Sequence, residues 1–260
     1  MNGVLSARGT SEQPIRINGI TVREPYGRHS SVITFMSSSG GWNEETGLGS
    51  VIENAVLNST LVEVYCSAKI ANCTLLPDSG LTLLAGSPVI SNCGLTFITI
   101  VGGSPTISNN YITGGIEYMN GLHTNSIVIS GNVFSGCQNC INLDGTSYGT
   151  VSIERNMIIG NDVGIEIRNN NQWKVATKVS VQNNTIVNNS KGILVTGHAE
   201  PPRVNYNNFE NKSEYNISPG PNDINATYNW WGTADSSAIN QTVYDFKNDF
   251  NIGTVNSATG

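Results

Sequence analysis

The stretch VSVQNNTIVNNSKGILV, residues 179–195, contains short apolar runs separated by pairs of asparagine. These apolar residues follow neither the 3.6-residue period of a helix nor the alternation of one long strand. The stretch contains the pattern apolar, x, x, polar, x, apolar, which runs from Val181 to Ile186. We call the first residue of this pattern the anchor. The pattern recurs seven times, with anchors at Ile52, Ile70, Ile90, Ile107, Ile129, Ile153 and Val204.

This repeat predicts a solenoid. Consecutive anchors lie 17 to 28 residues apart, and an irregular period of about twenty residues is typical of solenoid proteins. Ile141, Ile165 and Ile193 each follow their anchor by 12 residues. They belong to second strands that open with a small residue, as in GIEYM (115–119), CINLD (140–144), GIEIR (164–168) and GILVT (192–196). Each repeat is therefore predicted to form one coil of two or three short strands that stacks in parallel on the next.

A single coil of this size cannot be stable alone. Ordering about twenty residues costs roughly 1 to 2 kcal/mol of backbone entropy per residue, whereas five or six buried apolar side chains return only about 1.5 to 3 kcal/mol each. Stacking at the interstrand spacing of about 4.8 Å lets each coil share its core and pair its backbone with two neighbours.

The asparagines are predicted to form columns along the stack. Asparagine tolerates the left-handed conformation of a sharp bend, and its amide can donate to one neighbouring coil and accept from the other. Three residues after the anchors stand Asn110, Asn132, Asn156, Asn184 and Asn207. Two residues after the anchors stand Asn54, Asn72, Asn92 and Asn109. We expect these residues to form an asparagine ladder at one corner.

Composition agrees with an all-β chain. Only 12% of the 260 residues are charged and 35 are asparagine, so turn formers outnumber helix formers. The net charge of -6 includes only 13 basic residues, so a basic stripe for nucleic acid is not expected. No apolar run reaches membrane-spanning length, and the first residues do not form a signal peptide. We expect a soluble, single domain over residues 1–260, with first coils and a long insertion in 1–50, regular coils in 51–224, and a C-terminal coil and cap in 225–256.

These motifs resemble the right-handed parallel β-helix repeat proteins, a broad group with pectate-lyase-like folds and NosD-like carbohydrate-binding and sugar-hydrolase repeats. Residues 225–256 are similar to the C-terminal end of such domains in secreted bacterial and archaeal surface proteins, and residues 3–22 to their opening coil. The resemblance implies a right-handed parallel β-helix of about ten irregular coils at an extracellular or cell-surface location. It also raises copper, but no cluster of His or Met supports that metal.

One candidate binding surface lies along a loop edge. The segments that follow the second strand in four successive coils begin at Asn120, Asp144, Arg168 and Thr196. Aromatic faces beside charged and amide groups suit a sugar chain, which needs stacking and bidentate hydrogen bonds. The alternative is that these loops are simply polar surface loops. The expected contact residues are His123, Asp144, Tyr148, Arg168, Trp173, His198, Glu200 and Arg203.

A second candidate lies on the adjacent strand face, where alternation points Glu117, Asn142, Glu166 and Arg168 outward. Two carboxylates two coils apart would be about 9 to 10 Å apart, a separation at which inverting glycosidases place their acid and base. Together with Asp144, the residues Glu117, Glu166 and Arg168 form the candidate catalytic set. A solvated face gives the same pattern. The motifs of galacturonases, pectate lyases and alginate epimerases are absent, and the only near match is Gly197-His198-Ala199.

The cysteines and tryptophans are assigned structural roles. Cys73 and Cys93 share the position three residues after the anchor, so they should be stacked neighbours that form a disulfide or pack as small apolar groups. The pair Cys137 and Cys140 is expected at a turn before a strand. With Cys66 the count is odd, which leaves at least one free thiol. Trp230 and Trp231, with Phe246 and Phe250, are expected to cover the open end of the solenoid, whereas the environment of Trp42 is left open.

The favoured hypothesis is a non-catalytic extracellular β-helix module that is structural or adhesive and contacts a polysaccharide or cell-surface glycan. One alternative is a polysaccharide lyase or glycoside hydrolase that acts on an acidic glycan. A convergent carboxylate pair or a bound calcium ion would favour that enzyme, and no other cofactor is expected. A second alternative is a subunit that self-assembles by stacking its coils end to end.

Overall fold

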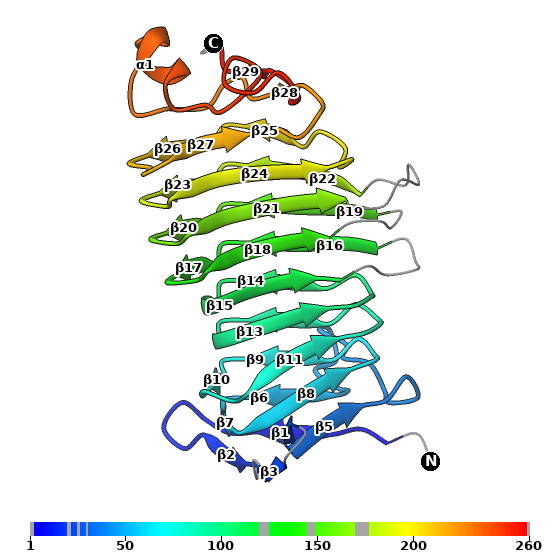
Figure 1. Ribbon diagram of the computed structural model, residues 1–260. Coiled ribbons are helices and arrows are strands. Elements are labelled where there is room, and N and C mark those ends of the chain that lie inside the picture. Colours follow the sequence, from blue (N-terminus) through cyan, green and yellow to red (C-terminus); the bar gives the residue numbers. More distant parts are fainter. Residues whose placement is uncertain are drawn as a thin grey trace.

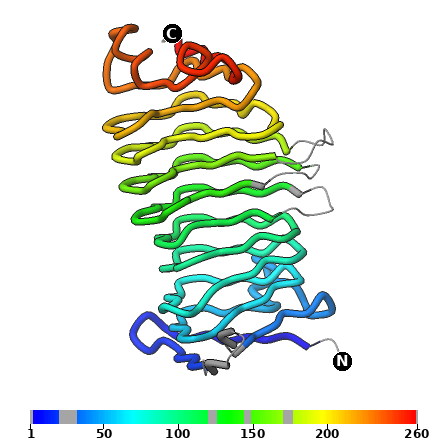
Figure 2. Tube along the Cα trace, in the orientation of Figure 1, coloured from blue at the N-terminus to red at the C-terminus, as the bar shows by residue number. Residues whose placement is uncertain are grey.

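The computed structural model describes residues 3–19, 22–24, 27–29, 31–119, 125–144, 149–169 and 177–258. In these residues the chain winds through successive coils that stack along one axis, from the N-terminal to the C-terminal end (Figure 1). Figure 2 shows the tube rising by one level with each coil. Every described pair of strands is parallel except β3 (Val22–Glu24) with β4 (Gly27–His29). The predicted all-β solenoid is therefore confirmed.

The anchors all lie in one nine-stranded sheet, which we call the anchor sheet. Its register pairs each anchor directly with the next one along the chain, so that Ile52 faces Ile70 and Ile153 faces Val181. Every anchor is fully buried. The strands, in spatial order, are β1 (Ser6–Arg8), β6 (Val51–Glu53), β9 (Lys69–Ala71), β12 (Val89–Ser91), β14 (Thr106–Ser108), β16 (Asn125–Ser130), β19 (Gly149–Glu154), β22 (Lys178–Gln182) and β25 (Arg203–Asn205).

Sixteen further strands form a second sheet with two legs, which β13 and β15 join because they run through both. The first leg contains β2 (Ile15–Asn18), β7 (Ala55–Asn58), β10 (Thr74–Leu75), β13 (Gly94–Ile100), β15 (Tyr111–Tyr118), β17 (Val133–Ser135), β20 (Met157–Ile159), β23 (Thr185–Val187) and β26 (Asn208–Glu210). The second leg adds β5 (Ser31–Phe35), β8 (Thr60–Val64), β11 (Gly80–Leu83), β18 (Asn139–Asp144), β21 (Val163–Asn169), β24 (Lys191–Gly197) and β27 (Tyr215–Ser218). The predicted second strands lie on this leg, where Ile141, Ile165 and Ile193 are in register.

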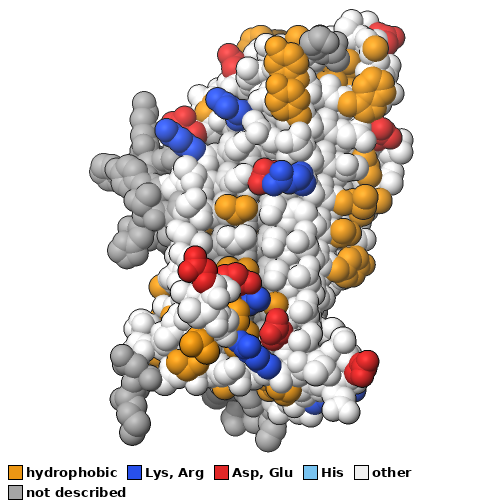
Figure 3. All heavy atoms as spheres, turned by 180° about the vertical axis from the view of Figure 1, so that it is seen from behind, with side chains coloured by type: hydrophobic (Ala, Val, Ile, Leu, Met, Phe, Trp, Pro, Cys, Tyr) orange, Lys and Arg blue, Asp and Glu red, His pale blue; other side chains and the backbone are white. Residues whose placement is uncertain are grey.

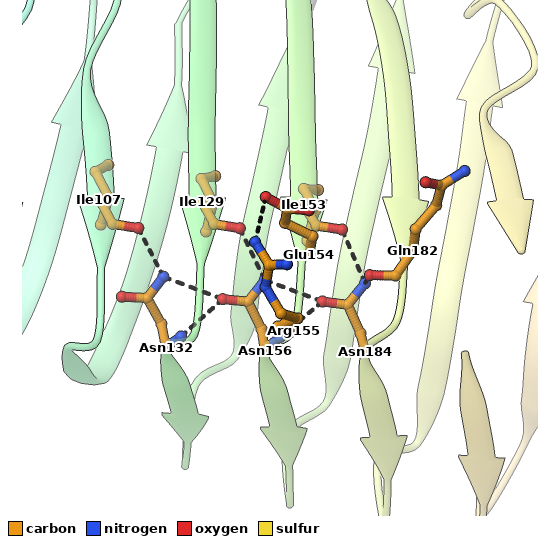
Figure 4. A network of polar contacts seen from close by, with 9 residues as sticks. All are labelled: Ile107, Ile129, Asn132, Ile153, Glu154, Arg155, Asn156, Gln182 and Asn184. Atoms are coloured by element: carbon orange, nitrogen blue, oxygen red, sulfur yellow. Dashed lines mark hydrogen bonds and ion pairs between the residues drawn. The ribbon is translucent and has the colours of Figure 1, made fainter. Parts of the chain in front are cut away.

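A buried asparagine ladder marks the corner between the anchor sheet and the first leg (Figure 4). Asn156 shows the repeating unit: its amide nitrogen donates to the carbonyl of Ile129 at 2.9 Å and to Asn184 Oδ1 at 3.0 Å. Its own Oδ1 accepts from the backbone and the side chain of Asn132. The ladder runs through Asn110, Asn132, Asn156, Asn184, Asn207 and Asn229. The prediction is confirmed, and Asn229 extends it by one coil.

The structure divides the two expected roles of asparagine between neighbouring positions. The residues two positions after the anchors adopt the left-handed conformation, whereas the ladder residues at the next position do not. We call the former the left-handed column. Its members are Asn54, Asn72, Asn92, Asn109, Gly131, Arg155, Asn183 and Tyr206, and it continues one coil further at Tyr228, directly before the ladder residue Asn229. The bend and the ladder are therefore made by different residues of each pair.

A second, shorter ladder was not predicted. Asn161 Nδ2 donates to Asn189 Oδ1 at 2.8 Å, and Asn189 Nδ2 donates to the carbonyl of Ile158. Asn161 Oδ1 accepts from the backbone of Cys137. These three residues share an offset of eight from their anchors, and the residues directly before them, Gly136, Gly160 and Asn188, are left-handed. The first corner was predicted from two consecutive positions at fixed distances from the anchor, and the same search at seven and eight residues after the anchor would have predicted this second corner.

The five cysteines are buried free thiols. Cys73 and Cys93 lie at the first ladder, Cys137 lies at the second, and Cys140 follows Cys137 by three residues. Cys73 and Cys93 stack as expected, because the backbone of Cys73 donates to Cys93 Sγ and that of Cys93 donates to Asn110 Oδ1. The contact with Cys73 and burial together raise the pKa of Cys93. Burial, and then the contact with Cys137, raise the pKa of Cys140. Cysteine thus replaces asparagine where a ladder begins.

The C-terminal end is closed by a cap that contains α1 (Ser236–Asn240), β28 (Ile224–Asn225) and β29 (Val255–Asn256). Trp231 is buried and stacks on Phe209 with ring centroids 5.0 Å apart, so it covers the core as expected. The expectation for the other aromatic residues was wrong. Trp230 is 50% exposed and Phe250 is 79% exposed, because Phe250 contacts Phe246 on the outside while Ile239 and Val243 fill the buried positions.

The long insertion before β6 folds back over the outer surface of the anchor sheet. Trp42 lies between two cations, with the Arg8 guanidinium 4.9 Å and the Lys69 ammonium 4.7 Å from its ring. Its indole nitrogen donates to Glu44, which also pairs with Lys69. The hydrogen bond to Trp42, and then Lys69, lower the pKa of Glu44. Trp42 therefore covers the first coils of this face.

Candidate functional site

The proposed catalytic residues lie on the outer surface of the second leg, in the register that alternation predicts. Glu117, Asn142 and Glu166 face one another on β15, β18 and β21, and Asp144 faces Arg168. The column of Glu117 continues to Leu194 on β24, so the row of polar residues ends there. The two carboxylates, Glu117 and Glu166, are thus two coils apart. The side chain of Asp144 lies outside the described residues.

Neighbouring side chains hold Glu166 in place. Asn139 Nδ2 donates to Glu166 Oε2 at 2.9 Å, and Arg168 Nη1 lies 3.9 Å from Glu166 Oε1. Only 13% of the Glu166 side chain is exposed. Beside it, Asn142 is largely covered, and its Oδ1 is buried without a hydrogen-bond partner in the described residues. This arrangement orients one carboxylate but leaves little of it accessible to a substrate.

A small hollow accompanies these residues. Its volume is about 180 Å³, and Glu117, Gln138, Asn139 and Asn142 form its polar wall beside Phe97. A cavity of this size is below the range of about 300 to 1,000 Å³ that is typical of ligand pockets. It can hold a single polar group rather than a chain of sugar rings.

Three of the predicted binding residues, His123, Tyr148 and Trp173, lie outside the described residues. His198 and Arg203 are described and exposed, as is Glu200. His198 follows β24 and its backbone donates to the carbonyl of Asn169. Arg203 begins β25 and lies one residue before an anchor, on the outer surface of the anchor sheet. The structure brings Arg203 and Glu200 to a common groove and does not place His198 in its lining.

This groove has a volume of about 360 Å³ and lies over β16, β19 and β22. We call it the anchor-sheet groove. Its wall on one side is the segment 200–203, and strand residues of three successive coils form its floor. The lining residues are Ser126, Ile127, Thr150, Val151, Ser152, Lys178, Val179, Ser180, Glu200, Pro201 and Arg203.

Charge and hydroxyl groups distinguish the anchor-sheet groove from the rest of the face. Lys178 and Arg203 are exposed, and neither forms an ion pair with a described residue. With Glu200 they leave one net positive charge on the groove of a chain whose net charge is -6. Ser126 and Thr150 contact each other through their hydroxyls at 3.3 Å. Such a surface offers cations for an anionic group and hydroxyls for hydrogen bonds.

The hydroxyl groups and Lys178 were missed from the sequence, although a regular offset identifies them. Residues one and three positions before an anchor point outward, because strand residues alternate between the two faces. Ser126, Thr150 and Lys178 stand three residues before their anchors and are in register. Ser152, Ser180 and Arg203 stand one residue before theirs. The sequence prediction concerned loop residues and did not include these outward strand positions.

Comparison with known proteins shows the family of this chain. A family model described as the right-handed beta helix region matches residues 49–213, which is well over half of the chain. The chain belongs to the right-handed β-helix family. Searches of curated proteins and of solved structures found no match to it. Membership in the right-handed β-helix family accounts for the parallel coils and their handedness, and it assigns no chemistry to the outer faces.

Two further findings concern this β-helix as a whole. Within the described residues, no three His, Cys, Asp or Glu side chains come together as a group that could hold a metal ion. The expectation that calcium could bind therefore stays a prediction. No described helix is long and apolar enough to cross a membrane.

Proposed function

We propose that this right-handed β-helix is a non-catalytic, extracellular or cell-surface module that binds an acidic polysaccharide in the anchor-sheet groove. The observation that carries the proposal is the pair of cations Lys178 and Arg203, which form no ion pair with any described residue and lie in a groove of about 360 Å³. Its volume falls within the usual range of ligand sites. A carboxylate on a sugar would give these two cations the anionic partner that the described residues do not supply.

The other lining groups suit the rest of a sugar ring. The serine and threonine hydroxyls of β16, β19 and β22 can donate to or accept from sugar hydroxyls. Ile127, Val151 and Val179 also border the groove, but their side chains are buried in the core, so the surface open to a sugar is mainly polar. Arginine can bind a carboxylate through two parallel hydrogen bonds, whereas lysine acts as a point charge.

The rigidity of the stack supports a binding role. Each lining strand is paired on both sides, as β19 is with β16 and β22, so the backbone that carries the lining residues is fixed before the ligand arrives. A preorganised site loses less conformational entropy on binding than a flexible one. The groove would therefore recognise a glycan without a large rearrangement.

The test is binding to immobilised polygalacturonate and alginate, with amylose as the neutral polysaccharide and with assay of the supernatant for released products. We expect retention on the acidic polymers that weakens in 0.5 M salt, because exposed charges are screened. The Lys178→Gln/Arg203→Gln variant should bind at least ten-fold more weakly. A matched variant, Arg16→Gln/Lys247→Gln, removes the same charge elsewhere and should bind like the native chain. Equal loss in both variants would show a nonspecific charge effect and refute the groove.

An enzymatic function is the second candidate, favoured by the aligned carboxylates Glu117 and Glu166 on neighbouring strands two coils apart. Product release from an acidic polysaccharide that disappears in the Glu166→Gln variant would support a lyase or hydrolase. Binding without products in the native chain would support the non-catalytic module.

A further inference from the structure

Two exposed tyrosines end the left-handed column. Tyr206 is 58% exposed and Tyr228 is 56% exposed. Their ring centroids lie 5.6 Å apart and their planes differ by 14°. Figure 3 shows that large hydrophobic side chains gather toward the C-terminal end of the back face. These two tyrosines are not part of the anchor-sheet groove.

Tyrosine is an unfavourable residue for this position. Both residues have a φ of 60°, a conformation in which a bulky side chain is strained and for which asparagine or glycine is suited. Six of the other seven members of the column are asparagine or glycine. Two successive coils nevertheless carry tyrosine. Strain that is retained beside exposed aromatic surface motivates a hypothesis of function.

The rings form a platform rather than a closed stack. Rings in face-to-face contact are about 3.5 to 4 Å apart, so a centroid separation of 5.6 Å requires the two rings to be displaced sideways. Part of each ring face therefore stays uncovered, in agreement with the exposure of both residues. Asn183, the exposed residue of the same column in the preceding coil, supplies a polar group beside the platform.

We propose that Tyr206 and Tyr228 bind two consecutive pyranose rings of a linear, neutral glycan that lies along the axis of the β-helix. The tyrosines repeat with the coil spacing of about 4.8 Å, which is close to the length of one sugar unit in an extended 1,4-linked chain. The apolar C–H face of each sugar ring would contact one aromatic face, and the sugar hydroxyls would reach the flanking amide of Asn183.

The size of the surface favours a glycan over a folded protein. Two aromatic side chains bury at most about 300 to 500 Å², whereas a specific protein interface buries more than about 1,000 Å². The polar flanks do not extend the apolar area to that size. This inference rests on the tyrosine pair alone and is independent of the anchor-sheet groove.

The test uses cellohexaose as the probe and saturation-transfer difference NMR as the first readout. We expect saturation of the sugar ring protons by the native chain and at least a ten-fold weaker affinity in the Tyr206→Asn/Tyr228→Asn variant. Asparagine is chosen because it suits the left-handed conformation, so this variant should melt at the same temperature as the native chain or higher. Tyr111→Asn, which removes another exposed tyrosine from β15, should leave binding unchanged.

The outcomes separate the platform from a structural role and from the groove. No saturation transfer to cellohexaose by the native chain would overturn the proposal. Unchanged binding with a lower melting temperature in the double asparagine variant would also overturn it and assign the rings to stability. The Lys178→Gln/Arg203→Gln variant should bind cellohexaose like the native chain, and loss of binding there would place the sugar in the groove instead.

Discussion

Two neighbouring columns at one corner of the β-helix follow opposite rules. The ladder position is buried and carries asparagine in six successive coils, from Asn110 to Asn229. The left-handed column, one residue earlier, faces outward and changes from asparagine through Gly131 and Arg155 to Tyr206 and Tyr228. Packing and hydrogen bonding restrict the first position, whereas only the backbone conformation restricts the second. A uniform column therefore reports on the fold, and a column that changes residue type shows where the surface is free to acquire a function.

The largest loss of stability is expected for Asn184→Ala, in the middle of the ladder. Asn184 donates to Asn207 and to the carbonyl of Ile153, and it accepts from Asn156. Its loss removes the acceptor of the Asn156 backbone N–H and the side-chain donor to the Ile153 carbonyl, both on the preceding coil, at about 1 to 3 kcal/mol each, whereas Asn207 Oδ1 keeps the Asn184 backbone N–H as its donor. We expect the free energy of unfolding to fall by roughly 3 to 5 kcal/mol, measured by urea denaturation. A loss below about 1 kcal/mol would mean that water replaces the ladder and that the column is not restricted as described.

The second ladder should respond less because it is shorter. Asn189→Ala removes the acceptor of Asn161 and the donor to the Ile158 carbonyl. The Asn189 side chain makes three hydrogen bonds where that of Asn184 makes five, so we expect a loss of about 2 to 3 kcal/mol in the same experiment. A larger effect than that of Asn184→Ala would contradict the dependence on ladder length.

The left-handed column is tested one residue before Asn184. Asn183→Ala removes no ladder contact, but alanine is less suited to the φ of 56° at this position. We expect a loss of about 1 kcal/mol. Asn183→Gly is the matched control and should be nearly neutral, since glycine adopts this conformation freely. If both variants lose the same stability, the side chain rather than the backbone conformation matters here.

The smallest expected effect concerns a second pair of stacked tyrosines, which is less exposed than the platform. Tyr215 stacks on Tyr244 at 5.8 Å, and burial, followed by the charge of Glu214, raises the pKa of Tyr215 to about 12. The unfolded chain releases this proton near pH 10, so between about pH 10 and 12 the unfolded state binds fewer protons and stability falls as pH rises. We expect a loss of less than about 1 kcal/mol after solvent screening.

Tyr215→Phe supplies the control for this prediction, because phenylalanine cannot ionise. Thermal melts of both chains at pH 9 and pH 11 should show a smaller decrease for the variant than for the native chain. Equal decreases would assign the alkaline loss of stability to other groups.

The sequence predicts the interior of this molecule well because the interior repeats. The anchors, the second strands and the first ladder each depend on a fixed offset that stacking imposes, and all of them lie in register as expected. Asn161 and Asn189 also repeat at a fixed offset, eight residues after their anchors, but the sequence prediction did not include them. Trp230, Phe246 and Phe250 were misassigned because the cap does not repeat. Nothing in the pattern separates the buried Trp231 from the exposed Trp230 or Phe250.

The candidate sites are less predictable, since outer positions are not constrained by neighbours. The register of Glu117, Asn142 and Glu166 was predictable, but the contacts of Glu166 with Asn139 and Arg168 depend on side-chain conformations. The groove over β16, β19 and β22 arises from the path of the segment 200–203, which no offset encodes. Of the loop residues expected to bind sugar, only Glu200 and Arg203 line that groove in the described structure.

The ladder also has a direction. At each of its steps the amide nitrogen of one coil donates to the oxygen of the coil that follows, from Asn110 to Asn229. The amide dipoles therefore point the same way and add along the axis, with their positive ends toward the C-terminus. Hydrogen bonds that are linked in this way polarise and strengthen one another. Each step of the ladder therefore strengthens the steps beside it, so the coils that the ladder joins stabilise one another cooperatively.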